Sequence, residues 1–264
     1  MAEHFALVTG ASSGIGYELA KELANRDYDL IVASAGPRLA PAAEEFRNFG
    51  IQVIEANFDL TKREGVNDLW RKVEEVGRPV DVACINAGVG VGGFFDETEL
   101  DAELNMIELN CASTVQLAKH VVKQMKTLHA GRILFTASIA GEMVAPREAV
   151  YAATKAFVLS FAHSLRFELK DTGVVVTALQ PGPTDTDFFH RAGMDNTEVG
   201  QKGKTESKAS DVARQGIEAL MDGKDHVYAA SAKTKLEGMM ANMIPGNVKG
   251  AMHEKMAKPV EDKK

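Results

Sequence analysis

Short runs of β-forming residues alternate with longer amphipathic segments along most of this 264-residue chain. The β-forming runs predict strands at Phe5–Thr9, Leu30–Ser34, Gln52–Asn57, Val80–Asn86, Arg132–Ala137, Val174–Gln180 and Val227–Ala230. Helical spacing of apolar residues is clearest at Gly14–Asn25, Thr61–Val76, Leu100–Leu128, Tyr151–Lys170 and Ser210–Met221. Strands that alternate with helices predict right-handed βαβ units and a parallel sheet. We therefore expect an α/β protein, a single doubly wound domain of Rossmann type with about seven parallel strands and helices on both faces.

Local patterns refine this expectation. The runs Leu30–Ala33 and Val174–Leu179 are almost uniformly apolar, which is typical of strands buried on both faces of a sheet. Thr61 and Glu64 have the spacing of a capping box and predict a helix that starts at Thr61. We expect residues 1–232 to form the domain, and residues 233–264 to form a Met-rich, C-terminal helical extension that packs against it and ends in a frayed tail.

Composition excludes several classes of function. The net charge of −7 provides no basic field for nucleic acid or an anionic membrane. No apolar run is long enough to span a bilayer, and no secretory signal precedes the first strand, so we expect a cytoplasmic protein. The two cysteines, Cys84 and Cys111, fit buried free thiols. No cluster of histidine and cysteine predicts a metal site.

A glycine-rich turn follows the first predicted strand and opens the first predicted helix. Gly10, Gly14 and Gly16 allow a tight turn and let the backbone come close to a pyrophosphate. The helix N-terminus offers free N–H groups and a positive dipole to the same phosphates. This segment predicts a dinucleotide site that includes Gly10, Ser12, Ser13, Gly14, Ile15 and Gly16.

A second motif predicts acid/base chemistry. Tyr151 and Lys155 are four residues apart and share one face of a predicted helix. A cation beside a phenol favours the phenolate and lowers the tyrosine pKa from its usual value of about 10. Ser138, thirteen residues before Tyr151, can orient a substrate oxygen on the same proton. Most such Tyr/Lys pairs are ordinary solvated helix faces, so this motif depends on its context.

These motifs together resemble those of the short-chain dehydrogenase/reductase family, from Phe5 to Ala230. The resemblance implies hydride transfer between a nicotinamide and a carbonyl or alcohol carbon. It implies that Tyr151 is the general acid/base and that Lys155 lowers the pKa of Tyr151 and binds the nicotinamide ribose. It also implies that Ser138 holds the substrate oxygen and that Asn110 holds a water of the proton relay. Asn110 can instead be a helix-kink residue. Further cofactor contacts are implied for Asp59, Leu60, Asn86, Ala87, Gly88, Pro181, Gly182, Thr184 and Thr186.

The residues after the second strand bear on the choice of cofactor. NAD-dependent relatives carry an acidic residue where this chain has Ala33, and many NADP-dependent relatives carry an arginine where it has Ser34. Arg38 lies close enough in sequence to reach a 2′-phosphate, although it can equally be a surface residue at a helix start. Without a carboxylate to repel the phosphate, the sequence favours NADP over NAD.

Family geometry also implies a largely apolar pocket for a small carbonyl or alcohol substrate. Its candidate residues are Phe94, Met143, Val144, Phe188 and Phe189, for several of which a core role is equally plausible. The segment 185–207, rich in glycine and small polar residues, is expected to be a mobile lid.

Two other functions use the same framework. An epimerase or dehydratase can use the same Tyr/Lys pair, and a non-catalytic module can sense nicotinamide redox state. The chain length argues against the first, and the presence of Tyr151, Lys155 and Ser138 argues against the second. The resemblance further implies a homodimer or homotetramer, and the C-terminal extension can contribute to it or cover the pocket.

Overall fold

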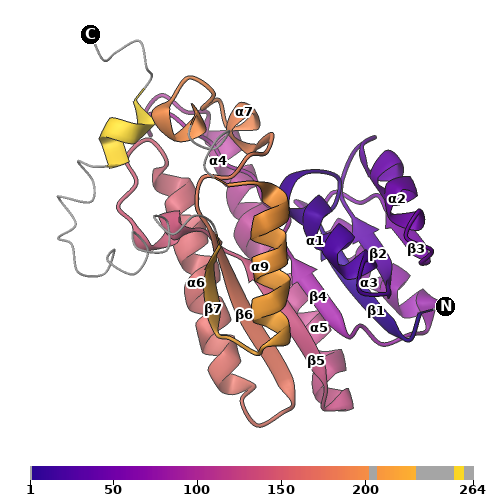
Figure 1. Ribbon diagram of the computed structural model, residues 1–264. Helices are drawn as coiled ribbons and strands as arrows, with labels where there is room; N and C mark the ends of the chain where they lie inside the picture. The colour runs from indigo at the N-terminus through magenta and orange to yellow at the C-terminus, as the bar shows by residue number, and fades with distance from the viewer. Residues whose placement is uncertain (1, 202–206, 230–252, 259–264) are drawn as a thin grey trace.

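The computed structural model describes residues 2–201, 207–229 and 253–258, and within them seven parallel strands form one sheet (Figure 1). The strand order is β3-β2-β1-β4-β5-β6-β7, which confirms the predicted Rossmann-type architecture. The strands are β1 His4–Thr9, β2 Tyr28–Ala33, β3 Val53–Ala56, β4 Val82–Ile85, β5 Gly131–Thr136, β6 Val174–Pro181 and β7 His226–Ala229. Ala230, the predicted end of the last strand, lies outside the described residues.

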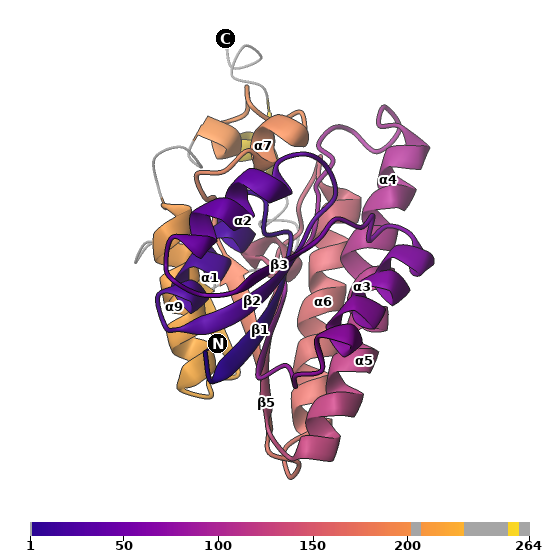
Figure 2. The ribbon, with the colours of Figure 1, turned by 90° about the vertical axis from the view of Figure 1, so that its right-hand side faces the viewer.

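Helices cover both faces of the sheet, which Figure 2 shows nearly edge-on. One layer contains α1 Gly14–Ala24, α2 Leu39–Arg47 and α9 Ala209–Met221. The opposite layer contains α3 Arg63–Val76, α4 Leu100–Ile107, α5 Ser113–Leu128 and α6 Ala149–Glu168. Short helical segments are the π-helical turn η1 Glu108–Ala112, the 3-10 turn η2 Ile139–Glu142 and α7 Phe188–Arg191.

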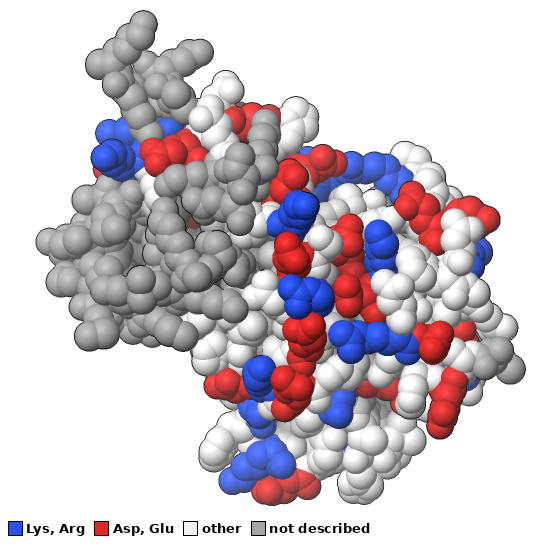
Figure 3. Space-filling view, in the orientation of Figure 1, with Lys and Arg blue, Asp and Glu red and all other residues white. Residues whose placement is uncertain are grey.

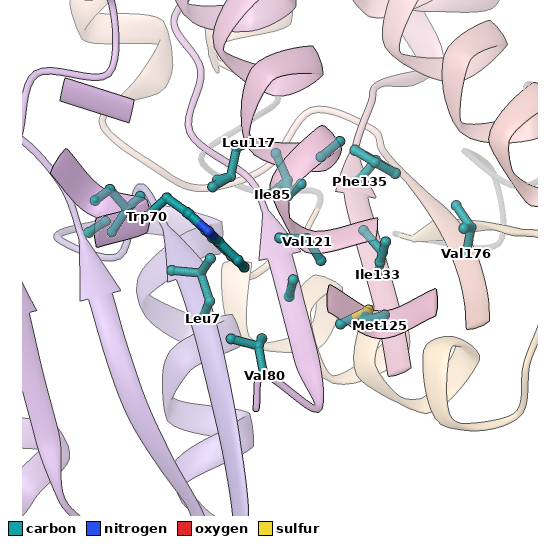
Figure 4. Packing of buried hydrophobic residues seen from close by; sticks show 14 of the residues in the cluster. Leu7, Trp70, Val80, Ile85, Leu117, Val121, Met125, Ile133, Phe135 and Val176 are labelled. Carbon is teal, nitrogen blue, oxygen red and sulfur yellow. The ribbon is translucent and has the colours of Figure 1, made fainter. Parts of the chain in front are cut away.

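Alternate residues of each central strand enter different cores. Phe5 and Leu7 pack under α3, α5 and α6, whereas Ala6 and Val8 pack under α1, α2 and α9. Figure 4 shows the first of these cores, with Leu7 near Trp70 and Val80. Burial of both sides of β2, and of all but one residue of β6, confirms the prediction from the apolar runs Leu30–Ala33 and Val174–Leu179.

Two helix predictions need correction. Helix α3 begins at Arg63, not at Thr61, and its N-cap Lys62 makes no side-chain capping bond. The Thr61 hydroxyl instead donates to Asp59 Oδ1 at 2.7 Å, so the capping box is wrong because a nearer carboxylate takes the hydroxyl. The predicted helix Leu100–Leu128 is continuous, but it widens into the π-helical turn η1.

Basic and acidic side chains are interspersed over α9 and its surroundings in Figure 3. No helix in the described ranges is long and apolar enough to cross a membrane. Of the predicted Met-rich extension, residues 253–257 form a helical turn with Met256 partly buried, whereas Met239, Met240, Met243 and Met252 lie outside the described residues.

One buried carboxylate links the amino-terminal ends of several strands. Asp29 in β2 is almost fully buried, and it accepts hydrogen bonds from the backbone N–H groups of Ala2 at 2.9 Å and Gln52 at 2.7 Å. The guanidinium of Arg78, which precedes β4, donates to the same carboxylate. Burial by itself would raise the pKa of Asp29, but these hydrogen bonds and the Arg78 charge hold that pKa below its usual value.

Asp29→Asn should therefore lower the free energy of unfolding by about 3 kcal/mol, because Arg78 then faces a neutral group that can accept fewer hydrogen bonds. Since the folded-state pKa of Asp29 is lowered, this stabilisation is present above the unfolded pKa of about 4 and is lost as the pH falls below it. Urea unfolding at neutral and acidic pH measures both effects. Asp68→Asn, at an exposed helix ion pair with Arg71, is the control and should change little.

Candidate active site

The candidate site lies at the carboxyl edge of the sheet, where β1, β4, β5 and β6 all end. The strand order reverses between β1 and β4, and such a reversal point is where open α/β sheets bind ligands. The residues that follow these strands are the glycine-rich turn, the 86–88 segment, Ser138 and the 181–186 segment. The sequence predicted functional residues in all four, and the fold brings all four to one edge.

The glycine-rich turn is packed so closely that larger residues do not fit. Gly10 has a φ of +70°, and a Cβ there would lie 3.0 Å from the Cα of Ala87. A Cβ on Gly16 would lie 2.3 Å from the carbonyl oxygen of Gly10. These two glycines are therefore required by the turn itself.

The first turn of α1 fits a pyrophosphate. Ser13, its N-cap residue, is extended and makes no side-chain capping bond, and the first turn carries no acidic residue. The N-terminal N–H groups of α1 are thus left without a side-chain acceptor, as an anion site requires. Ser12 and Ser34 share a hydrogen bond of 2.9 Å between their hydroxyls, which joins the turn to the end of β2, and Ile15 packs on the core beneath.

Asn86 links three strands below the turn. Its backbone N–H and that of Ala87 both donate to the Thr9 hydroxyl, each at 3.0 Å. Its side-chain amide donates to the Thr9 carbonyl at 3.0 Å and accepts from the Thr136 hydroxyl at 3.0 Å. Asn86 therefore supports the sheet edge, and no sequence pattern predicted Thr9 and Thr136 as its partners.

Tyr151, Lys155 and Ser138 lie together, as predicted, and all three are buried. Lys155 Nζ donates to the carbonyl of Thr136 at 2.9 Å and lies 5.8 Å from the centre of the Tyr151 ring. The Ser138 hydroxyl is within hydrogen-bonding reach of the phenol and accepts from the N–H of Ala140 at 3.1 Å. A Cβ on Gly141 would lie 2.7 Å from the carbonyl carbon of Lys155, so glycine lets η2 approach α6 and bring Ser138 to Tyr151.

Burial dominates the ionisation of the pair in the protein by itself. Burial and then the charge of Glu148 raise the pKa of Tyr151, while the hydrogen bond with Ser138 acts in the opposite direction. Burial also lowers the pKa of Lys155 to about 8. The expected lowering of the Tyr151 pKa by Lys155 is therefore outweighed here, and the phenol is held in its protonated form.

Asn110 lies in the π-helical turn η1 and has its side-chain amide fully engaged. Its Oδ1 accepts from the Val89 N–H at 3.0 Å, and its Nδ2 donates to the Val89 carbonyl at 2.9 Å and to the Thr154 hydroxyl at 3.0 Å. A Cβ on Gly88 would lie 3.0 Å from Asn110 Oδ1 and 3.4 Å from Lys155 Nζ. Asn110 thus holds the chain after β4 against α6 beside Lys155, and its role in a water relay stays a prediction.

The residues predicted around the adenosine have partners within the protein. Asp59 Oδ1 accepts from the N–H of Thr61 at 3.0 Å as well as from its hydroxyl, and Leu60 is buried in the core. Arg38 forms an ion pair with Asp187, 149 residues further along the chain. Both side chains of this pair are about half exposed, at 53% and 55%. No sequence pattern predicted a contact between residues so far apart.

The segment after β6 folds over the glycine-rich turn. Pro181 ends β6, and the Gly182 N–H donates to the Ala229 carbonyl. Thr184 is buried, and its hydroxyl donates to the Gly182 carbonyl at 2.8 Å. The Thr186 hydroxyl accepts from the N–H of Phe188 at 3.2 Å, and a Cβ on Gly14 would lie 3.1 Å from the Thr186 methyl group.

Only part of the predicted apolar pocket gathers around Tyr151. The ring of Phe188 lies 5.2 Å from that of Tyr151, centre to centre, and half-buried Met143 follows η2. Phe189 instead packs in a small cluster of the segment's own residues, which we call the lid cluster: Phe189, Ala192, Met194 and Val199. Phe94 lies under the guanidinium of Arg147, 3.9 Å from its ring centre, and Val144 is exposed.

A family model, that of the short chain dehydrogenases, matches residues 4–197. The chain belongs to this family. The match spans the glycine-rich turn, Asn110, Ser138, Tyr151, Lys155 and the segment after β6.

Individual relatives agree with this assignment. The chain is 33% identical over 217 residues to an uncharacterized oxidoreductase of Staphylococcus saprophyticus, covering 81% of this chain and 90% of the relative. It is 36% identical over 232 residues to the 1-deoxy-11-beta-hydroxypentalenate dehydrogenase of Streptomyces exfoliatus, covering 86% and 82%. A short-chain dehydrogenase from Sphingobium yanoikuyae, solved in complex with NADPH, has a TM-score of 0.79 at 27% identity, covering 91% of this chain and 94% of that one.

The lowered pKa of Lys155 predicts how stability depends on pH. Because the folded-state pKa is about 8 and the unfolded one is about 10.4, the unfolded chain binds more protons between these values, so stability rises with pH there. From about pH 7 to about pH 9, the wild type should gain roughly 1 kcal/mol relative to Lys155→Met. Urea unfolding at both pH values measures this gain. Lys170→Met, which removes an exposed lysine just after α6, is the control and should gain as much stability as the wild type over this pH range. A Lys155→Met variant that gained as much stability as Lys170→Met would contradict the prediction.

Proposed function

We propose that this short-chain dehydrogenase is an NADP-dependent oxidoreductase that interconverts a carbonyl and a secondary alcohol on a small, largely apolar substrate. The observation that carries this proposal is the grouping of buried Tyr151, Lys155 and Ser138 beside the reversal point of the sheet. When bound, the nicotinamide supplies or accepts the hydride.

The chain's own residues then manage the proton and the substrate oxygen. In reduction, Tyr151 donates its phenolic proton to the oxygen that becomes the alcohol, and Ser138 holds the same oxygen by a hydrogen bond. The raised pKa of Tyr151 suits this direction, since the phenol is kept protonated. Lys155 would hold the ribose of the nicotinamide, and Phe188, whose ring packs at a tilt against that of Tyr151, would limit the access of water.

NADP is the proposed cofactor because no acidic residue follows or ends β2. Ala33 is fully buried and ends the strand, and the next residue, Ser34, offers a hydroxyl. Arg38 is a cation four residues after Ser34, and its surface pair with Asp187 is of a kind that contributes little stability. A 2′-phosphate can therefore take Arg38 from Asp187 at small cost.

Exposed apolar side chains support a homo-oligomer. Leu100, Leu104 and Ile107 project from α4, and Phe157 projects from α6. A shallow apolar groove between these helices includes Ile107, Val115 and Phe157. Burial of this surface against a second copy of the chain would remove it from water.

Tyr151→Phe should lower kcat by about 10²-fold or more, because it removes the proton that the reaction transfers and changes little volume. Cofactor affinity, measured by fluorescence titration with NADPH, should stay within about twofold of wild type. Turnover is measured at the nicotinamide absorbance with a panel of ketones, and in reverse with the matching alcohols. A variant that keeps more than about a tenth of wild-type kcat would show that Tyr151 is not the acid/base. The same panel, if it gave no turnover in wild type, would favour an epimerase, a dehydratase or a nicotinamide sensor.

Arg38→Ala should weaken NADPH binding by about tenfold and NADH binding by less than about twofold, because only NADPH presents a phosphate to the guanidinium. Asp187→Asn should act in the opposite direction and tighten NADPH binding, since it releases Arg38. Calorimetric titration measures the affinity of the wild type and of each variant for NADPH and for NADH. Arg26→Ala, which removes a surface pair with Glu22, is the control. Equal losses for both cofactors in Arg38→Ala, or a wild type that prefers NADH, would contradict the NADP assignment.

A further inference from the structure

A buried pair of polar side chains joins the C-terminal segment to the start of α6. His253 Nε2 and Glu148 Oε2 are 2.7 Å apart, and their side chains are only 5% and 6% exposed. The two residues are 105 positions apart in the chain. The proposed function assigns no role to His253.

The position of Glu148 makes this pair unusual. Glu148 is the N-cap residue of α6, but its side chain makes no capping hydrogen bond to that helix. The guanidinium of the preceding residue, Arg147, lies over the Phe94 ring instead. A buried carboxylate needs a charged or hydrogen-bonding partner, and His253 is the partner that the structure provides.

The same C-terminal segment has a second contact near the site. Met256 packs on the lid cluster, and Ala257 is buried. Phe188 packs on that cluster as well as on Tyr151. In Figure 1 the yellow turn that contains residues 253–257 lies beside α7, at the same end of the molecule. A route of packing contacts therefore leads from this segment to Tyr151 through the lid cluster and Phe188, and the pair with Glu148 links the segment to a charge one helical turn before Tyr151.

The charged surroundings of Tyr151 are few in the described part of the chain. Glu148 lies one helical turn before it and Lys155 one turn after it on α6, Ser138 approaches from the end of β5, and the lid presents the uncharged Phe188. After burial, the Glu148 charge is the next largest cause that raises the pKa of Tyr151. On the His253 turn, Glu254 and Lys258 form their own exposed pair and Lys255 is also exposed, while His253 Nδ1 has no partner among the described residues.

We propose that His253 and Glu148 are positioning residues of the active site. Their pair holds residues 253–258 against the lid cluster, and it sets the charge that acts on the Tyr151 phenol one helical turn away. This inference rests on the proposed function, in which Tyr151 exchanges the proton. With His253 in place, the Glu148 charge is partly offset. Without His253, the same carboxylate faces the phenol with no partner.

The test is the pH dependence of alcohol oxidation, which needs the deprotonated form of Tyr151. For the best alcohol of the panel with NADP, kcat/KM is measured across pH for the whole chain and its variants. Glu148→Gln should lower the apparent pKa of the rising limb by about one unit, because it removes the charge that opposes the phenolate. His253→Leu should raise that apparent pKa by a similar amount. Glu254→Gln, on the neighbouring exposed residue, should leave the profile unchanged.

Shifts in opposite directions for the two variants support the proposal, since a purely structural role would change kcat or KM without moving the profile in opposite directions. Absent shifts, or shifts in one direction, overturn it. If His253→Leu does not fold, the double variant Glu148→Gln/His253→Leu leaves no unpaired charge and should reproduce the profile of Glu148→Gln. A wild type without turnover would overturn the proposed function and this inference with it, whereas an active enzyme with unshifted profiles would overturn this inference alone.

Discussion

The hydrogen bonds between Thr9 and the 86–87 backbone are the interaction on which the site depends. They hold β1 against β4 at the place where the strand order reverses, and the Thr136 hydroxyl extends the same network to β5 through Asn86. A Cβ on Gly10 would lie 2.9 Å from Asn86 Nδ2, so the glycine-rich turn lies directly on this network. The glycine-rich turn is thus fixed relative to the end of β5, where the Thr136 carbonyl accepts from Lys155 Nζ.

The proposed catalytic residues occupy positions that disfavour their charged forms. Tyr151 and Lys155 are both buried, and burial opposes the charged form of each, which is why the pKa of the phenol is raised and that of the ammonium is lowered. A parallel sheet covered by helices on both faces leaves little water at these positions. The same dry surroundings strengthen every hydrogen bond and charge that acts on the reacting oxygen.

Much of this arrangement could be predicted from the sequence because it depends on local patterns. Apolar runs predicted the strands, the spacing of Gly10, Gly14 and Gly16 predicted the turn, and Tyr151 with Lys155 predicted one shared helix face. The capping box at Thr61 failed because the Asp59 carboxylate, two residues away, accepts the hydroxyl. Phe188 and Phe189 are neighbours in sequence, and only the fold of α7 determines that the first faces Tyr151 and the second faces the lid cluster.

The contacts that sequence patterns could not predict join distant parts of the chain, and three consecutive residues make several of them. Thr186 lies against Gly14 in the phosphate turn, Asp187 pairs with Arg38 after β2, and Phe188 packs on Tyr151. Such a short stretch of backbone cannot move at one of these points without disturbing the other two. Release of Asp187 by a competing anion at Arg38 would therefore change the restraint on Phe188. In the proposed function, this would connect cofactor recognition by Arg38 to the enclosure of the substrate beside Tyr151.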